Sequence, residues 1–396
     1  MVDKLRFVGM LMNLTDLCEV FTDGDWIESK DQSKDGIRLI QTGNIGIGQF
    51  IEKDDKAKYI SIETFERLKC TEVFEGDILV SRLPDPIGRA CIVPNKTERM
   101  ITAVDCTICR PKADIIDREY LCYFMQSKTY YERLFNNVTG TTRKRISRKN
   151  LGNVEIYVPS KEEQKIIVKK LNLLTKIISN RTKELSYLDN LIKARFVEMF
   201  GNPITNEKGW NVEELDSVCD AIGDGLHGTP EYDEDGKYPF INGNNLMNGV
   251  IEVTPSTKKV SEKTYKKYYI ELTDNAILLS INGTLGKLAF YNGEEVMLGK
   301  SACYCNLKQK INREFVYGVM KTEAFTRFLE RNATASTIKN VGLRAIRGFK
   351  LILPPEELQI KFVNFSRQID KSKVAIQKSL AETQLLFDKL MQDYFG

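Results

Sequence analysis

The chain has 396 residues and a formal net charge of only +4. This length allows two globular units with separate cores plus connecting helices, while the small net charge means that a nucleic-acid partner would have to be met by local basic patches. The single histidine excludes zinc fingers of the two-Cys, two-His kind, and the longest apolar run, around Ala276–Leu279, is far shorter than the roughly 20 residues of a membrane span.

The nine cysteines are an odd number, and the start of the chain lacks the basic segment and apolar run of a secretory leader. We therefore expect free thiols in a reducing compartment, and a cytoplasmic protein. Cys106-x-x-Cys109 and Cys303-x-Cys305 resemble pairs of metal ligands, but both lie in alternating, strand-like runs and their spacings differ. The better interpretation is buried strand cysteines, with no metal site.

Residues 1–158 are predicted to form the first globular unit. In chain order the pattern predicts a short helix at 14–19, a strand and the glycine turn that follows it within 37–45, a buried strand at 76–82, a helix at 117–135 and a last strand at 154–158. Between the last two elements lies a polar loop, residues 138–150, that contains five basic residues and no acid.

A long helix is predicted at 159–201, because its apolar residues recur in alternating steps of three and four. That spacing is typical of a coiled-coil seam. The seam residues are Ile167, Leu171, Leu174, Ile178, Leu185, Leu188, Ile192 and Met199, with Arg181 and Arg195 interrupting.

The second half repeats the first. Leu215–Asp220 matches the start of the first unit at an offset of 201, and a second acid-free loop occupies 332–344. Residues 354–396 then align with 159–201 without a gap. This second helix carries the seam Phe362, Ile369, Ile376, Leu380, Phe387, Leu390 and Tyr394. The predicted architecture is an α/β (α+β) fold of two units, 1–158 and 202–353, alternating with two long helices. We expect the helices to pair as an antiparallel coiled coil, which gives the chain internal pseudo-twofold symmetry. Two ordinary helices packed on separate cores remain the alternative.

The loops of both units carry chemistry that suits duplex DNA, a ligand with its own approximate dyad. Cations neutralise phosphates, while hydroxyls and amides bond phosphates or base edges. The candidates in the first unit are Asn44, Arg82, Arg89, Thr141, Thr142, Arg143, Lys144, Arg145, Ser147, Arg148 and Lys149. Those in the second are His227, Thr229, Asn242, Asn244, Asn245, Asn282, Thr284, Lys287, Thr334, Ser336, Thr337, Lys339, Asn340 and Arg344. For any one residue a solvated surface position is an equal alternative, but the acid-free loops recur in step with the repeat, which favours DNA contact.

The whole chain resembles the specificity subunit of a type I restriction-modification system. The residues that carry the resemblance are Gly209-Trp210, Ile222–Pro230, Phe240–Asn245, Gly283–Lys287, and the Pro-x-x-Glu-x-Gln starts at Pro159 and Pro354. Each motif is moderately specific, and their ordered duplication is highly specific. The first half departs from the pattern at Asp23–Asp25, which lacks the His-Gly-Thr-Pro continuation, and at Pro84–Pro86, which replaces the Asn-Gly-Thr turn.

The resemblance implies a DNA-reading subunit without chemistry of its own. Each target-recognition domain would read one half of a split site, and the helices would fix the gap and dock two modification subunits. Those partners would bind S-adenosylmethionine and methylate an adenine, and motor-nuclease subunits would join for restriction.

The sequence offers little for competing functions. An amino-methyltransferase needs an Asn/Asp-Pro-Pro-aromatic motif, and the only adjacent prolines are Pro354-Pro355. The run Gly293–Ser301 has one residue too many between its glycines for a phosphate loop, and no nucleophile motif accompanies His227, whose expected role is to face DNA or to stabilise its turn. A protein–protein adaptor, or a specificity module of a related type II-like methylation system, remains the alternative.

Overall fold

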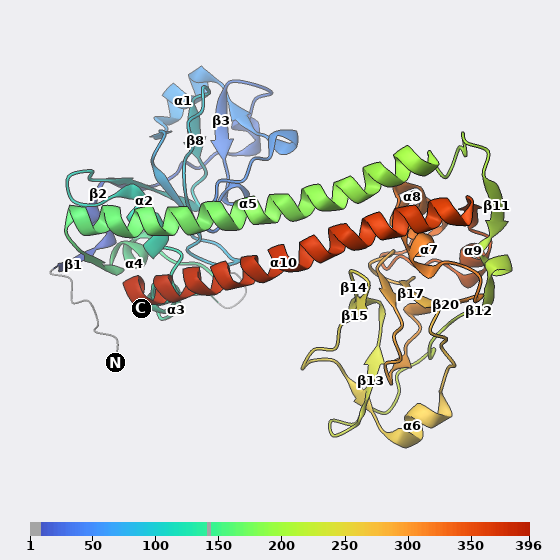
Figure 1. Cartoon of the computed structure of the whole chain (residues 1–396). Coiled ribbons are helices and arrows are strands. Elements are labelled where there is room, and N and C mark those ends of the chain that lie inside the picture. The colour runs from blue at the N-terminus through green and yellow to red at the C-terminus, as the bar shows by residue number, and fades with distance from the viewer. Residues whose placement is uncertain (1–8, 141–143) are drawn as a thin grey trace. The chain divides into compact units, whose positions relative to one another are not determined.

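The computed structural model describes residues 9–140 and 144–396, and the chain divides into two compact units. The first contains residues 1–182 and 378–396, and the second contains residues 183–377. Both boundaries fall inside the two long helices, α5 (Lys161–Phe200) and α10 (Glu356–Phe395), which are drawn as continuous rods in Figure 1. Each unit therefore combines one globular part with a portion of both helices.

The first unit holds three sheets. A two-stranded sheet pairs β1 with β10, a four-stranded antiparallel sheet has the order β2-β9-β6-β7, and a mixed sheet has the order β4-β3-β8-β5. The strands are β1 (Met10–Asn13), β2 (Cys18–Asp23), β3 (Ile37–Ile40), β4 (Tyr59–Ile60), β5 (Glu72–Val73), β6 (Ile78–Ser81), β7 (Ala90–Ile92), β8 (Met100–Thr102), β9 (Cys106–Pro111) and β10 (Glu155–Val158). The helices besides α5 and α10 are α1 (Ile62–Leu68), α2 (Arg118–Phe124), α3 (Lys128–Phe135) and α4 (Arg148–Gly152).

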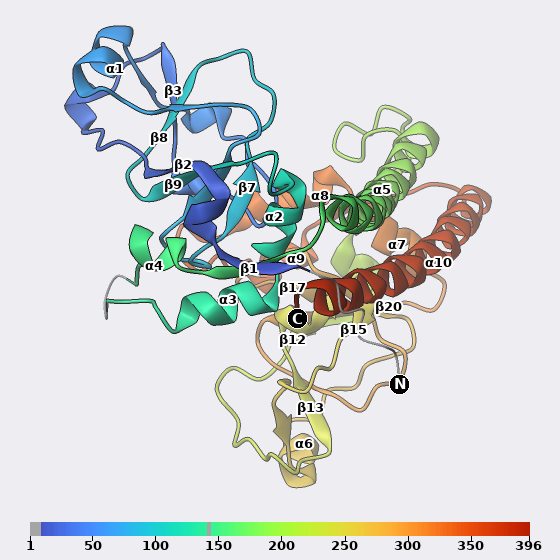
Figure 2. The ribbon, with the colours of Figure 1, turned by 90° about the vertical axis from the view of Figure 1, so that its left-hand side faces the viewer.

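Alternation along β6 explains how these elements stack in layers. Ile78 and Val80 point to one face and pack with α2, α3 and the two long helices, whereas Leu79 points to the other face and packs with β3 and β8. The outer face of the β3–β8 sheet is covered in turn by α1. Figure 2 shows the same order, with α2 beside α5 and the β3–β8 sheet and α1 farthest from the long helices.

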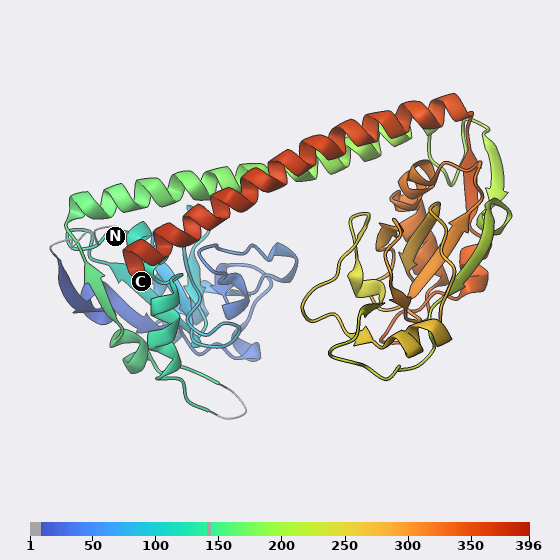
Figure 3. The same cartoon turned by 60° about the horizontal axis from the view of Figure 1, so that its bottom comes forward.

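The second unit repeats this plan, as Figure 3 shows from another side. Its sheets have the orders β11-β21, β12-β20-β17-β18, β16-β13-β19 and β14-β15. The strands are β11 (Asn211–Glu214), β12 (Cys219–Asp224), β13 (Tyr238–Ile241), β14 (Leu246–Met247), β15 (Val250–Ile251), β16 (Lys259–Val260), β17 (Ala276–Ser280), β18 (Leu288–Phe290), β19 (Met297–Leu298), β20 (Ala302–Leu307) and β21 (Lys350–Leu353). The helices are α6 (Glu262–Lys267), α7 (Arg313–Met320), α8 (Glu323–Asn332) and α9 (Leu343–Arg347).

The long helices bury part of the predicted seam, including Ile167, Leu171, Phe362 and Ile376, and they also bury Phe196 and Phe200, which the seam prediction did not include. In the second unit Phe196 of α5 meets Phe362 of α10 with ring centroids 5.3 Å apart, and Lys373 Nζ lies 2.7 Å from Asp189 Oδ1, so the two helices run antiparallel there. In the first unit Lys170 Nζ donates to the Tyr394 hydroxyl at 3.2 Å. Lys373, a polar residue between the seam positions Ile369 and Ile376, thus forms an ion pair with the facing helix.

Two expectations about elements need correction. The predicted helix at 117–135 is two helices, α2 and α3, because the Ser127 side chain accepts from the Tyr130 N–H and caps a new helix start. The short helix expected at 14–19 is one 3-10 turn, Leu14–Leu17, after which β2 begins. The strand and glycine turn expected over 37–45 are confirmed as β3, which ends at Ile40, and the 3-10 turn η3 (Thr42–Asn44).

Candidate nucleic-acid interface

The predicted loops gather at one edge of the antiparallel sheet in each unit. In the first unit β2 and β6 both pair antiparallel with β9, so they run parallel to each other and end together, with Asp23 opposite Thr107 and Ser81 opposite Cys106. The second unit has the same arrangement of β12 and β17 around β20. We call this the loop edge: the ends of β2 and β6, or of β12 and β17, with the loops that follow them.

Backbone hydrogen bonds fix the acid-free loops to this edge. In the first unit the N–H of Ile146 donates to the carbonyl of Arg82 at 3.3 Å. In the second unit the N–H of Val341 donates to the carbonyl of Ile281 at 2.9 Å, and the N–H of Gly283 donates to that of Lys339, also at 2.9 Å. Each loop is therefore joined to the end of the same central strand.

Most of the loop candidates are exposed, as DNA contact requires. The exposed ones are Lys144, Arg145, Ser147, Arg148, Lys149, Thr334, Ser336, Thr337, Lys339 and Arg344, and Asn340 is half-buried. Thr141, Thr142 and Arg143 lie outside the described residues.

Arg145 lies 3.4 Å from a carboxylate oxygen of Asp105, which screens part of its charge, and Ser147 caps α4 by accepting from the Asn150 N–H.

Asn44 and Arg82 are buried and bonded within the unit, which favours a structural role, and their contact with DNA stays an untested prediction. Asn44 is 7% exposed, and its amide accepts from the Gln41 N–H and donates to the Ile51 carbonyl. Arg82 is 3% exposed and donates to the carbonyls of Ile146 and Val104, and burial lowers its pKa. Both side chains hold loops together instead of presenting groups to a ligand.

Arg89 has a similar structural task. Its guanidinium is half-buried and donates to the carbonyls of Ile45 and Thr42 in the η3 turn and to those of Leu83 and Pro86. These four bonds use most of the N–H donors of the guanidinium, so Arg89 already holds the η3 turn and the loop after β6, and its contact with DNA stays a prediction.

The asparagines of the second glycine turn divide between structure and surface. Asn245 accepts from the Asn242 N–H and donates to the Glu252 carbonyl, and Asn242 accepts from the Ser301 hydroxyl at 2.9 Å. Asn245 therefore holds the turn, as Asn44 does in the first unit. Asn244 is exposed and makes none of these bonds.

The remaining candidates of the second unit lie on or near its loop edge. His227, Thr229 and Thr284 are exposed, and Asn282 and Lys287 are half-buried. The backbone of Asn282 pairs with that of Asn340, and the His227 ring nitrogen Nε2 lies 2.8 Å from Asp224 Oδ2. All five remain candidates for contact with a ligand.

Sequence reasoning missed Trp26, whose residue surface is 70% exposed immediately after the end of β2. A signal was present, because Trp26 aligns with His227 at the offset of 201 that also relates the first segments of the two units.

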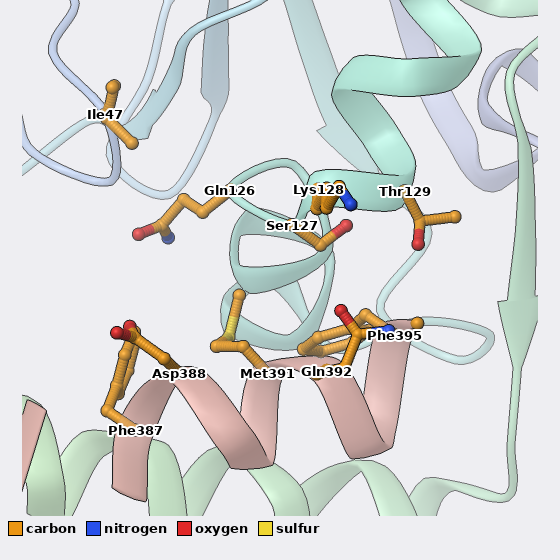
Figure 4. A pocket seen from close by; sticks show the side chains of 11 residues that line it. Ile47, Gln126, Ser127, Lys128, Thr129, Phe387, Asp388, Met391, Gln392 and Phe395 are labelled. Carbon is orange, nitrogen blue, oxygen red and sulfur yellow. The ribbon is translucent and has the colours of Figure 1, made fainter. Parts of the chain in front are cut away.

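Two pockets lie in the first unit. One of about 380 Å³ lies between the start of α3 and the last turns of α10, with Phe387, Met391 and Phe395 among its lining residues; none of the predicted DNA contacts lines it (Figure 4). The other, of about 250 Å³, lies beside η3 and is lined by Arg38, Lys53, Lys56 and Lys58 without an acidic residue. Arg38 is held by Asp54 and Glu98.

Comparison with known proteins agrees with the duplicated plan. The model of the type I restriction modification DNA specificity domain matches residues 10–187 and again residues 207–384. The chain belongs to this family. Each matched range contains one globular part and most of the long helix that follows it.

Relatives within the type I specificity family match this chain over different shares of its length. The MjaIX type I restriction enzyme specificity subunit of Methanocaldococcus jannaschii is 25% identical over 402 residues, which is 93% of this chain and 85% of the relative. The EcoBI specificity subunit of Escherichia coli is 28% identical over 196 residues, 48% of this chain and 40% of the relative.

Solved structures share the fold of this type I specificity chain. The crystal structure of a type I restriction-modification S subunit from M. genitalium has a TM-score of 0.56 at 15% identity and covers 99% of this chain and 97% of its own. A structure described for complex assembly and conformational transition of the type I R-M system has a TM-score of 0.57 at 17% identity and covers 98% of this chain and 97% of its own.

The cysteines, the acidic side chains and the helices of this type I specificity chain bear on other classes of site. The nine cysteines are free and buried, and those at 106, 109, 303 and 305 lie in β9 and β20, as interpreted from the sequence. Among residues 9–140 and 144–396 no three or more His, Cys, Asp or Glu side chains are grouped as metal ligands. Within the same residues, none of the helices has the length and apolar character for crossing a membrane.

Proposed function

We propose that this chain is the DNA-recognising specificity subunit of a type I restriction-modification complex. Each globular part would act as a target-recognition domain and read one half of a split DNA site. The observation that carries the proposal is the repeated loop edge: in a chain of the DNA specificity family, the same acid-free loop is joined to the same strand end in both units.

The chemistry of the loops supports a division of labour. Lys144, Lys149, Lys339 and Arg344 are exposed cations that suit phosphates and so fix the position of the duplex. Hydroxyls in the same loops, such as those of Ser336 and Thr337, are exposed and suit base edges or further phosphates. Affinity would come from the cations and sequence preference from the smaller polar groups.

The two long helices supply a means of setting the gap between half-sites. Each has 40 residues, which corresponds to about 60 Å at a rise of roughly 1.5 Å per residue. We propose that they also dock two modification subunits, that S-adenosylmethionine binds to those subunits and not to this chain, and that restriction subunits join the same complex. The chain itself would contribute recognition and no catalysis.

The experiment that tests the proposal is to co-express the chain with its modification partners in a host and to map methylated adenines across the genome. A split site with one adenine target in each half is the expected result. Exchanging the second globular part for that of another family member should change one half of the site, and inserting four residues into both long helices should lengthen the gap. A protein–protein adaptor would yield no methylation pattern and no salt-dependent binding to duplex DNA.

A further inference from the structure

Two glycines place the residues that follow β2 and β12 in the same way. A Cβ atom on Gly24 would clash with the backbone of Thr102, and one on Gly225 would clash with the backbone of Leu298. Only glycine allows so close an approach. The chain therefore leaves the two strands along the same path in both units.

The next residue in each unit is also held in place, by a backbone bridge. Asp25 forms an isolated parallel bridge with the loop before β9, and Leu226 forms one with the loop before β20. Trp26 and His227 come next, so they occupy equivalent positions in the two repeats. Both positions lie on the loop edge.

Both side chains are turned toward solvent. Trp26 is 70% exposed, and the side chain of His227 is 70% exposed. An indole in water is unusual, because a ring of that size contributes much stabilisation when it is buried. The only other tryptophan of the chain, Trp210, is half-buried and donates its ring N–H to the Phe200 carbonyl.

A carboxylate lies near each ring. Lys30, whose Nζ lies 2.8 Å from a Glu28 carboxylate oxygen, lowers the pKa of the Glu28 carboxyl, and the nearby Trp26 ring contributes to the same shift. The His227 nitrogen Nε2 lies 2.8 Å from Asp224 Oδ2. A contact to a ring nitrogen lies at the ring edge, so it leaves the flat faces of His227 open.

One cation lies on the same edge as Trp26. The Arg148 guanidinium of the first acid-free loop region lies 3.4 Å from the Thr22 hydroxyl, four residues before Trp26, although Asp25 and Glu28 flank that ring in the sequence. A flat side chain and a cation on one surface are a combination with which proteins hold bases and backbone together, since every base has a π face.

We propose that Trp26 and His227 are equivalent DNA-contacting side chains, each of which lays a ring face against a base or sugar in the half-site of its own target-recognition domain. This inference rests on the proposed function. It assigns a role in DNA contact to Trp26, and it specifies how His227, already a candidate, would contact DNA.

Fluorescence tests the role of Trp26 directly. The Trp210→Phe variant leaves Trp26 as the sole tryptophan of this chain. With the modification subunits bound, the emission of this variant minus that of the Trp26→Phe/Trp210→Phe double variant reports on Trp26. A duplex that carries the mapped site should quench this difference, and a scrambled duplex should quench it less at equal occupancy. Unchanged emission while anisotropy of a labelled duplex shows full binding would overturn the proposal.

Substitution tests both rings. Trp26→Ala should weaken binding to the mapped site by about 10- to 100-fold, the range of one lost base–aromatic stack, while Trp26→Phe retains a ring and should recover most of the affinity. His227→Ala should relax discrimination in the other half-site only. Matched controls are Ile62→Ala on α1 and Tyr269→Ala between α6 and β17, each 59% exposed and expected to bind like the parent.

The outcomes separate this inference from the proposed function. If the parent complex does not bind the duplex, the proposed function fails. If the parent binds and both alanine variants bind with its affinity and site preference, only the role of the two rings is refuted. Thermal unfolding of Trp26→Phe and Trp26→Ala checks that any loss does not come from misfolding.

Discussion

The charge on the second acid-free loop leads to a quantitative prediction about salt. Lys339 and Arg344 are exposed, and neither forms an ion pair with any residue that the structure describes. Each phosphate contact adds about 0.9 to the slope of log affinity against log salt concentration. The double variant Lys339→Gln/Arg344→Gln should therefore lower the magnitude of that slope by about 1.8. Between 50 and 200 mM salt, a fourfold change, the parent should lose about 12 times more affinity than the variant.

The assay is fluorescence anisotropy of a labelled 30-base-pair duplex of random sequence, titrated at several salt concentrations between about 50 and 200 mM. Lys263→Gln/Lys371→Gln is the matched control, because it removes two exposed charges from α6 and α10. Its slope should stay close to that of the parent apart from a small long-range effect. An equal slope for the parent and the loop variant would refute the assignment of this loop to the phosphate backbone.

Three further predictions concern the framework. Phe362 is 1% exposed, so Phe362→Ala should lower the free energy of unfolding of the second unit, measured in urea, by about 3–5 kcal/mol. The control Leu385→Ala lies on the same helix at a residue 72% exposed, and it should change the free energy of unfolding by less than about 0.5 kcal/mol. Asn245→Ala removes the bonds that hold its turn and should cost about 1–3 kcal/mol, whereas Asn244→Ala should be silent in the same urea titration. Burial raises the pKa of Cys91 to about 12, so a thiol reagent at pH 8 should react with this residue only after unfolding. The unfolded thiol has a pKa of about 8.5, so the folded chain keeps its proton to higher pH than the unfolded chain does. The free energy of unfolding should therefore fall as the pH rises above about 8.5.

The long helices could be predicted from the sequence because their signal is repeated over 40 residues. A seam in steps of three and four survives single polar interruptions, and Lys373 shows how one is accommodated, by an ion pair with Asp189. Short elements have no such redundancy. The break between α2 and α3 depends on one serine, Ser127, and nothing else in the apolar pattern marks it.

The candidate site could be predicted only in part. The absence of acids along 332–344 identifies a loop whose charge has no local neutralising partner, and the structure joins that loop to the loop edge. The sequence could not show that Asn44 and Arg82 are buried and bonded to backbone groups. A polar side chain near a turn can serve either a ligand or the turn itself, and only the positions of the neighbouring carbonyls decide between them.

The two repeats also separate framework positions from reading positions on physical grounds. Gly24 and Gly225 are the same residue because a Cβ atom fits at neither position. Trp26 and His227 are free to differ because both side chains point into solvent, where no packing restricts them. Two domains that read different half-sites need a backbone that stays constant and surface side chains that vary. The residues that differ between otherwise equivalent, exposed positions of the loop edge are therefore the ones in which sequence preference should reside.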